Sequence, residues 1–429
     1  VSEVLPVTVD TSSTKALGQL NVTNAGIRIS NPNELKTLEL PANKTKDFAL
    51  SSDIDLDEAG VEWDGPENYS GKFYGNGYTI KLVLSKNTTY GDPSISDKTS
   101  LFSTLGNGAL VQDIIIDASI TEAAKARKGS TYFGGVVGRI YLGSSNSASV
   151  TLRGIKTKGT LDFTSEAAGF ILVGGLIGEL GDAGIINIEN CGSELNASMA
   201  SYTYNAEGRL AGFGGFIGRI VANKASQTLT VNITNSYATG NLSVAGNITT
   251  ASLFCGGFIG DALTNNGGST LNLTMRNCYA AGNIAVSNTG ELVAAGELGA
   301  GGLIGFVWKT AGTTNVTLNN CAVVGQQVLL DYVDDNTPYG QTQNNRFVAV
   351  STADPPTSLI ITNGIARKGM LTGATPGTGD TSDGALTAQS GLGKTDEELK
   401  TATTWINANW SDSVWDFSGL PSGKWPTLK

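Results

Sequence analysis

The stretch that decides the fold is GGLIG at residues 301–305, because four near-copies of it occur earlier in the chain. Repetition at a period of roughly 20 to 50 residues is typical of solenoids and propellers, in which each unit buries its apolar face against its neighbours. We therefore interpret the pentapeptide as one step of a ladder. The earlier copies are GGVVG at 134–138, GGLIG at 174–178, GGFIG at 214–218 and GGFIG at 256–260.

Alternating aliphatic residues follow each copy, and in four repeats they end at an asparagine, as in VNITN at 231–235. Alternation with a period of two predicts a strand, and asparagine favours a turn with left-handed geometry or a side-chain bond to its own backbone. A short third strand follows, such as TLDF at 160–163. Three strands separated by corners make one coil of a parallel β-helix. The asparagines at matching places are Asn190, Asn235, Asn277 and Asn320.

Two columns of apolar residues follow from this interpretation. Equivalent residues of neighbouring coils would lie one strand spacing apart, about 4.7–4.9 Å. Adjacent residues of a strand point to opposite faces, so either a bend at the glycines turns both columns inward or the preceding connection covers the outer one. One column holds Val137, Ile177, Ile217, Ile259 and Ile304, and the other holds Val136, Leu176, Phe216, Phe258 and Leu303.

Composition excludes several classes of function. The chain of 429 residues carries 28 basic and 38 acidic residues, a formal net charge of -10, so we expect no nucleic-acid partner. Its 56 glycines and its charged content of only 15% favour turn-rich β structure over helices. The chain has no histidine, which removes the commonest metal ligand and neutral-pH acid or base.

The ends of the chain depart from the repeat, as the terminal units of a solenoid must. NPNELKTLEL at 31–40 predicts a capping helix with Asn31 or Asn33 as its N-cap and Pro32 in its first turn.

At the other end, Thr395 and Glu398 predict a capping box that opens a helix, and we expect this helix to plug the ladder. Its apolar face would hold Leu399, Ala402, Ile406 and Trp410.

These observations predict one all-β domain over residues 1–429, a parallel β-helix of about seven coils with helical and loop caps. We expect an N-terminal strand and capping helix at 1–47, coils at 48–370, a mobile loop at 371–393 and a C-terminal cap at 394–429.

Specific phrases resemble a known family. GGLIG, with NCYAAGNI at 277–284, resembles the bacterial GLUG repeat, and GKWPTLK at 423–429 is similar to the terminal cap of such proteins. The likeness covers roughly residues 27–429, although Ser236 and Gly154 replace the family cysteine. The resemblance implies a right-handed parallel β-helix that serves as a cell-surface or extracellular adhesin. A peptidase attached to some members needs an HExxH zinc motif, which a chain without histidine cannot form.

The expected function is therefore non-catalytic adhesion or ligand binding by an exported monomer without a cofactor. The partner would be a host or environmental glycan or protein, and the signal or lipoprotein segment would lie outside this sequence, as would any membrane anchor. A polysaccharide lyase or glycosidase on the same fold and a structural spacer stay open as alternatives. Recognition would lie in connections on one side of the ladder, at 86–98, 122–132, 198–210, 245–254, 286–299 and 331–345.

Aromatic side chains in these segments are the candidate ligand-binding residues, although packing against the ladder would use the same rings. The first group is Tyr202, Tyr204 and Tyr332, and the second is Trp63, Tyr69 and Tyr74.

Two charged patterns and the cysteines complete the candidates. Alternate spacing puts Asp53, Asp55 and Asp57 on one strand face, where calcium could bind, but a solvated strand end explains them equally and we predict no metal site. The cysteines, Cys191, Cys255, Cys278 and Cys321, favour free buried thiols, with Cys278 and Cys321 close enough to bond. One repeat position carries alternating charges that suggest a solvated, paired face, at Arg139, Glu179, Arg219 and Asp261.

Overall fold

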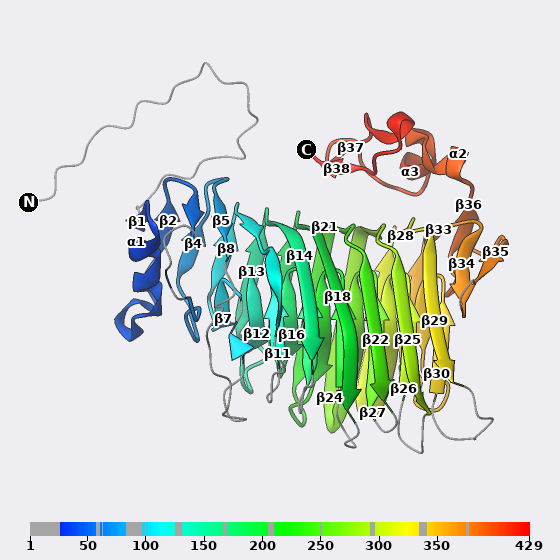
Figure 1. Ribbon diagram of the computed structural model, residues 1–429, viewed down its shortest axis with the longest axis horizontal. Coiled ribbons are helices and arrows are strands. Elements are labelled where there is room, and N and C mark those ends of the chain that lie inside the picture. The colour runs from blue at the N-terminus through cyan, green and yellow to red at the C-terminus, as the bar shows by residue number, and fades with distance from the viewer. Residues whose placement is uncertain are drawn as a thin grey trace, which may run out of the picture.

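The protein is all-β, with long parallel sheets that are consistent with the predicted β-helix (Figure 1). No helix in the described part is long and apolar enough to cross a membrane. The computed structural model describes residues 26–56, 61, 63–82, 97–98, 100–124, 131–165, 170–204, 210–248, 251–291, 297–333, 341–374 and 377–429.

The GGxxG steps lie side by side and in register. The first glycine of each step pairs with its equivalents in the neighbouring repeats, as Gly214 does with Gly174 and Gly256. The strand before the glycines belongs to a separate seven-stranded parallel sheet, so the glycines are the bend through which the chain passes into the main sheet. The seven strands are β6 (Asp97–Lys98), β11 (Thr131–Gly134), β15 (Ile171–Gly174), β19 (Leu210–Gly214), β23 (Ser252–Gly256), β26 (Glu297–Gly301) and β30 (Gln341–Asn345).

The strands after the glycines form the first ladder of the main sheet. Ile217 pairs with Ile177 and Ile259, which confirms the predicted register. Both predicted apolar columns belong to one buried cluster, so the bend turns both inward. This ladder runs through β7 (Phe102–Leu105), β12 (Val137–Tyr141), β16 (Ile177–Gly181), β20 (Ile217–Ala222), the starts of β24 (Ile259–Ala280) and β27 (Ile304–Asn319), and β31 (Val348–Val350).

The second ladder carries the alternating strands and ends at the asparagine corner. These asparagines have φ of 49–54°, the predicted left-handed conformation. From Asn235 onward each side-chain amide donates to the asparagine of the preceding repeat rather than to its own backbone, as Asn277 Nδ2 does to Asn235 Oδ1 at 3.1 Å. The ladder runs through β1 (Ile27–Ile29), β2 (Phe48–Leu50), β4 (Lys72–Tyr74), β8 (Leu110–Gln112), β13 (Ser149–Arg153), β17 (Gly184–Glu189), β21 (Thr228–Ala238), the later parts of β24 and β27, and β32 (Ser358–Thr362).

The third ladder follows the corner and completes each repeat. It runs through β3 (Ile54–Asp55), β5 (Thr79–Lys81), β9 (Ile115–Asp117), β10 (Ile120–Ala124), β14 (Lys156–Ser165), β18 (Gly192–Tyr204), β22 (Leu242–Ile248), β25 (Ile284–Glu291), β29 (Gln327–Val333) and β34 (Met370–Gly373). Short strands at the corner are β28 (Ala322–Val323), β33 (Ile365–Arg367) and β36 (Leu392–Lys394).

The N-terminal cap confirms the sequence prediction. Helix α1 (Pro32–Lys36) begins after Asn31, whose side chain accepts a hydrogen bond from the Glu34 amide. The 3-10 turns η1 (Thr37–Glu39) and η2 (Pro41–Asn43) follow it, and Leu35 and Leu38 join the core. Figure 1 shows this cap at the blue end of the ladder.

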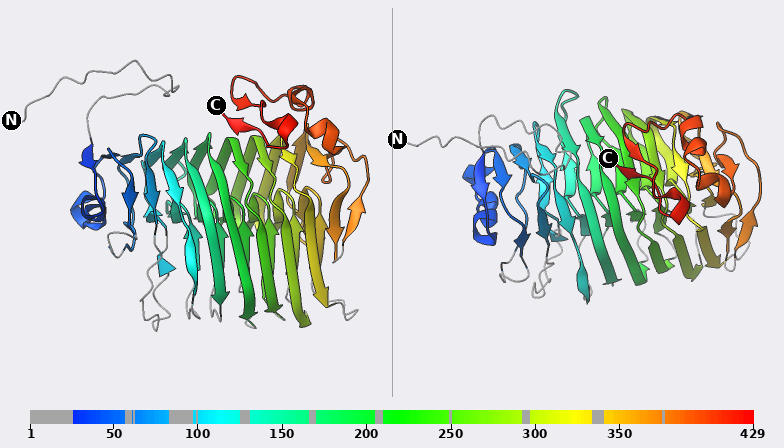
Figure 2. Two further views of the ribbon diagram at one scale, coloured as in Figure 1. Left: turned by 45° about the horizontal axis from the view of Figure 1, so that its top comes forward. Right: turned by 90° about the horizontal axis from the view of Figure 1, so that it is seen from above.

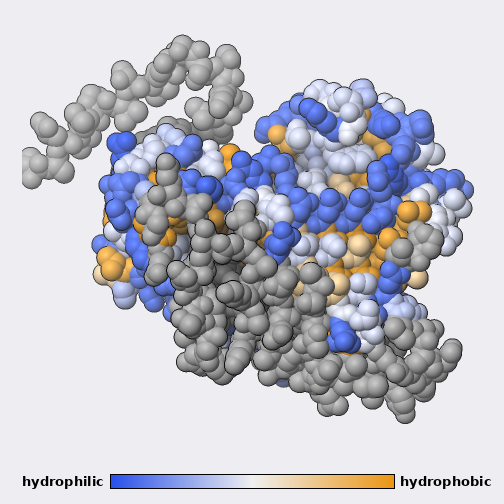
Figure 3. Space-filling model, in the orientation of Figure 1, coloured by the Kyte–Doolittle hydropathy of each residue, from blue (hydrophilic) through white to orange (hydrophobic). Residues whose placement is uncertain are grey.

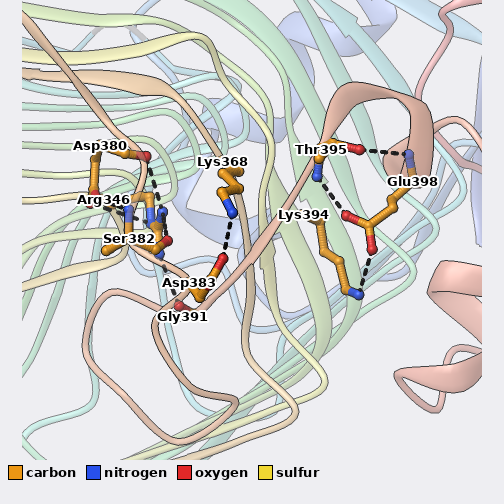
Figure 4. Close-up of polar contacts among 9 residues, drawn as sticks. All are labelled: Arg346, Lys368, Asp380, Ser382, Asp383, Gly391, Lys394, Thr395 and Glu398. Carbon is orange, nitrogen blue, oxygen red and sulfur yellow. Dashed lines mark hydrogen bonds and ion pairs between the residues drawn. The ribbon is translucent and has the colours of Figure 1, made fainter.

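The segment predicted as a mobile loop at 371–393 instead covers the last repeat, so this prediction is wrong. Strand β35 (Thr378–Asp380) pairs with β34, and the segment after it is held by Arg346 (Figure 4). The buried Arg346 guanidinium donates to the carbonyl oxygens of Ser390 at 2.8 Å, Gly391 at 3.0 Å and Ser382 at 3.2 Å. The composition of this segment indicated a loop. The sequence could not show that Arg346, which lies far away in the chain, holds the segment in place. We call residues 377–391 the lid.

The C-terminal cap does not plug the end of the ladder, contrary to the prediction. It folds back along the flank and packs on Tyr237 and Tyr279 (Figure 2). The Tyr279 hydroxyl donates to the Pro426 carbonyl at 2.7 Å. The cap consists of α2 (Asp396–Leu399), α3 (Ala402–Asn407), β37 (Trp415–Asp416), η3 (Leu420–Ser422) and β38 (Thr427–Leu428).

The cap's first helix begins as predicted, because Thr395 and Glu398 form a complete capping box. The predicted single helix is two short ones, however, and its predicted face is wrong in part. Ile406 is 46% exposed, whereas Trp405 is buried.

The four cysteines are free and buried, as predicted. Cys278 and Ser236 occupy paired positions in neighbouring repeats, whereas Gly154, with φ of 62°, takes the place of the corner asparagine rather than of a cysteine. Burial raises the pKa of the Cys191 and Cys321 thiols to about 12, which keeps them protonated at neutral pH.

Ile217 tests the register of the first ladder. An Ile217→Asp substitution would place an unpaired carboxylate in the core cluster and cost several kcal/mol of folding free energy. Thermal melting should show a marked loss of stability. The matched control is Thr230→Asp on the half-buried outer face of β21, which should change the melting temperature much less. Wild-type stability in the Ile217 variant would contradict the register.

Candidate functional site

A row of alternating charges crosses four neighbouring repeats, and we call Arg139, Glu179, Arg219 and Asp261 the charged row. Strand pairing places each residue beside the next. Arg139 Nε lies 3.5 Å from Glu179 Oε2, and Arg219 Nε lies 3.5 Å from Asp261 Oδ2. The other Glu179 oxygen lies 4.0 Å from Arg219 Nη1. The pairing between repeats suggested by the sequence is therefore present.

The expected solvation of this row is wrong. Glu179 is 4% exposed, Arg219 8% and Asp261 0%. The reason is the bend at the glycines. It brings the outer face of each first-ladder strand against the strands that precede the glycines. A Cβ atom on Gly212, in β19, would lie 3.3 Å from Asp261 Oδ1. Replacing a buried ion pair with well-packed apolar residues is often neutral or stabilising, so these pairs by themselves are weak evidence of added stability.

Aromatic rings surround the charged row. Arg139 lies between the rings of Tyr132 and Tyr141, 4.2 and 4.1 Å from their centroids. The Tyr141 hydroxyl donates to Glu179, and the row ends where Phe306 takes the equivalent position. Sequence reasoning did not single out Tyr141, although an aromatic residue two positions after Arg139 was a usable signal.

Two acids near the end of the row have unusual pKa values. Burial raises the pKa of Asp261 to about 7, against the opposing attraction of Arg219. The side chain of Trp308 also opposes the shift, so burial outweighs both neighbours. Burial, together with the charge of Asp354, also raises the pKa of Glu297 to about 7.

Acids with such values can serve as general acid or base when a substrate reaches them. Asp261 has no exposed surface, and Gly212 packs against it. The charged row therefore affects the stability of the folded repeats, and Asp261 is a buried carboxyl group that can bind a proton.

The N-terminal aspartates do not assemble a calcium site in the described residues. Asp53 accepts a hydrogen bond from the Thr79 amide at 2.7 Å, and Asp55 pairs with Lys81 at 3.0 Å. Asp57 lies outside the described residues. Within them, no three acidic or cysteine side chains are grouped to hold a metal ion. Asp53, Asp55, Lys81 and Asp117 line a shallow surface pocket whose charges are already paired in part.

Two of the N-terminal aromatic candidates are core residues, so assigning them to a ligand surface was wrong. Trp63 is 5% exposed, and its indole N–H lies 3.1 Å from the Ser100 carbonyl oxygen. The buried Tyr69 ring stacks on Phe102 at 5.1 Å, and its hydroxyl lies 2.9 Å from the Lys46 carbonyl oxygen. Buried aromatic residues commonly satisfy their polar tip in this way. Tyr74, in β4, is half-buried.

The strands that flank the predicted recognition segments are stacked on one another. Tyr204 at the end of β18 pairs with Ile248 at the end of β22, and Ser252 at the start of β23 pairs with Leu210. The connections therefore leave the third ladder at one edge, which we call the connection edge. They are shorter than predicted, because β18 extends to Tyr204 and β22 to Ile248.

One register column at the connection edge carries two tyrosines, three strands apart. Tyr202 pairs with Gly246, Gly246 with Asn288, and Asn288 with Tyr332. Tyr332 is 40% exposed, whereas Asn288 is buried and bonds to the backbone of Ile248. The side chains of Tyr202 and Tyr204 lie outside the described part of the structure.

Asp261 predicts a pH dependence of folding. Its folded pKa of about 7 lies above the ordinary value of 3.8, so the folded state binds this proton more tightly. The resulting stability is fully present below about pH 4 and is lost as the pH rises through about 7. Glu297 adds to the same trend. From pH 5 to 8 the free energy of unfolding of the wild type, measured by chemical unfolding, should fall by about 1–4 kcal/mol. The Asp261→Asn substitution should remove this decline.

Asp412→Asn is the control, since this carboxylate is exposed on the C-terminal cap and its removal should leave the decline unchanged. An identical pH profile in wild type and Asp261→Asn would show that the buried carboxyl titrates normally.

Comparison with known proteins adds little to this description. No protein-family model matches the chain, and no curated protein matches it. Among solved structures, one crystal structure named "putative immunoglobulin A1 protease from Bacteroides ovatus" is similar, with a TM-score of 0.49 and 16% identity. The match covers 94% of this chain and 91% of that chain.

Proposed function

We propose that the protein is a right-handed parallel β-helix of about seven coils, built from GLUG-type repeats, that works as a non-catalytic adhesion or ligand-binding module. It would act at the cell surface or outside the cell. The continuous in-register pairing and the caps at both ends support this architecture. A rigid ladder of this kind holds corresponding connections along one edge, which suits recognition of an extended ligand.

The observation that carries the binding proposal is the column from Tyr202 to Tyr332 at the connection edge. Its two tyrosines are three strand spacings apart, about 14–15 Å along the ladder. Between them lie Gly246, without a side chain, and Asn288, which is turned into the core. Two aromatic positions at this separation along one edge suit stacking on separate sugar rings of one glycan chain.

We favour a glycan over a protein partner. A protein interface usually centres on a packed apolar cluster of anchors, whereas Tyr332 at this edge has the buried polar Asn288 as its neighbour in register.

The enzyme alternative finds less support. The described acids with raised pKa values belong to the charged row and its surroundings, and Asp261 has no exposed surface. Asp55, which a calcium-dependent lyase could use, is paired with Lys81. The spacer alternative makes no use of Tyr332, so loss of binding in a folded variant separates it from the proposal.

A glycan array with the purified protein tests the proposal. We expect binding to a polysaccharide without release of products. Combined replacement of Tyr202, Tyr204 and Tyr332 by alanine should weaken that binding at least about tenfold, because each lost aromatic contact is worth roughly 0.5–1.5 kcal/mol. Circular dichroism should show an unchanged fold. The control is Tyr74→Ala, in the half-buried N-terminal group, which should bind normally.

Undiminished affinity in the folded triple variant would place the site elsewhere. New reducing ends or unsaturated sugars would favour the lyase or glycosidase. Binding to extracellular-matrix proteins with no glycan bound would contradict the choice of ligand while leaving the adhesion proposal in place.

A further inference from the structure

The C-terminal end of the ladder is covered unevenly. Strand β36 pairs with β33, and β35 pairs with β34. The lid reaches β31, where the Gln389 carbonyl accepts a hydrogen bond from the Val348 amide at 3.2 Å. Strand β32 pairs with β27 on one side, and no strand of the described residues pairs with its other side. An open strand edge therefore ends the second ladder.

The sequence of this edge strand, SLIIT at 358–362, lacks the usual protection. Natural edge strands carry charged residues, proline or bulges that discourage pairing with another chain. Strand β32 has none of these, and Leu359 is only half-buried at the end of the core. Ile360, its central residue, is 53% exposed.

The outward position of Ile360 is polar in each preceding strand of this register column back to Thr151, and one strand earlier, in β8, it is Leu110. Ile360 pairs with Thr317, which pairs with Thr274. The column continues through Asn232 and Asn187 to Thr151. A β-branched apolar residue thus follows a run of polar ones at the strand where the edge is open, and it favours a contact that the strands from β13 to β27 do not make.

Other exposed apolar side chains gather at the same end. Of seven large ones exposed in the described part, three belong to the last repeat or the lid: Ile360, Leu371 and Leu386. Leu386 lies beside the corner that follows β32, because its carbonyl accepts a hydrogen bond from the Gly364 amide at 2.8 Å. Figure 3 shows hydrophobic surface toward the C-terminal end of the ladder, below the more hydrophilic cap. Clustered exposed apolar residues mark interaction surfaces.

We propose that β32 pairs with β32 of a second copy of this chain, antiparallel across a two-fold axis. A two-fold axis brings identical edges together and closes at a dimer. Ile360 is the middle residue of the strand, so it would lie opposite Ile360 of the second copy, in a favourable β-branched cross-strand pair. A second copy is the natural occupant because the strands of this ladder pair with their equivalents in neighbouring repeats, and within the described residues β32 lacks such an equivalent on its outer side. A dimer replaces the monomer expected from the sequence.

Ile360→Lys tests this proposal. The side chain is exposed, so the fold should tolerate lysine, whereas two lysines facing each other across the axis would repel. Light scattering coupled to size-exclusion chromatography should give twice the chain mass for the wild type and one chain mass for Ile360→Lys. The matched control is Ile406→Lys, which changes an isoleucine of similar exposure, 46%, on the C-terminal cap and should remain a dimer.

A monomeric wild type at all accessible concentrations would overturn the proposal, as would an Ile360→Lys variant that stays dimeric. Masses that grow beyond a dimer would indicate head-to-tail association and contradict the two-fold arrangement. Circular dichroism and thermal melting of both variants establish that loss of the dimer is not loss of the fold. Hydrogen exchange adds a direct readout, since the β32 amides should be protected in the wild type and exchange faster in Ile360→Lys.

Discussion

Neighbouring repeats approach each other so closely at the second glycine of each GGxxG step that no side chain fits. A Cβ atom on Gly215 would collide with the carbonyl oxygen of Gly257, and one on Gly257 would collide with that of Gly302. This approach aligns the repeats, and the apolar columns, the asparagine amides and the charged row then stack from one repeat to the next. Arg346 follows Asn345, which pairs with Gly301, so it takes the place of the second glycine. No further repeat lies above it, and its side chain can anchor the lid instead.

The periodic part of the fold could be predicted from the sequence, because each repeat confirms the position of the next. The isoleucine column, the left-handed asparagines and the buried cysteines all lay at the expected places. The terminal segments could not be placed, since contacts such as Tyr279 with Pro426 join residues that no periodicity relates. The alternating charges were visible in the sequence, but their burial was not. The bend that encloses Asp261 arises only when the two sheets are paired.

The candidate site was predicted less well than the fold. Tyr332 is exposed as expected, but Trp63 and Tyr69 are in the core, where their polar tips bond to backbone carbonyls. A single sequence does not distinguish an aromatic ring that packs from one that binds. The two surfaces proposed for contact with other molecules are different parts of the last repeats. The connection edge presents Tyr332 for a ligand, and β32 presents Ile360 for a second copy, so binding and assembly could occur together.

The stability of Gly257→Ala tests most directly the claim that close approach at the glycines determines the structure. The added methyl group would meet the Gly302 carbonyl, and overpacking of this kind typically costs about 1–3 kcal/mol. The matched control is Gly267→Ala, where nothing lies within 4 Å of the added atom. The account predicts that chemical unfolding shows a clear loss of stability for Gly257→Ala. Gly267→Ala should have wild-type or slightly higher stability. Equal stability of the two variants would contradict it.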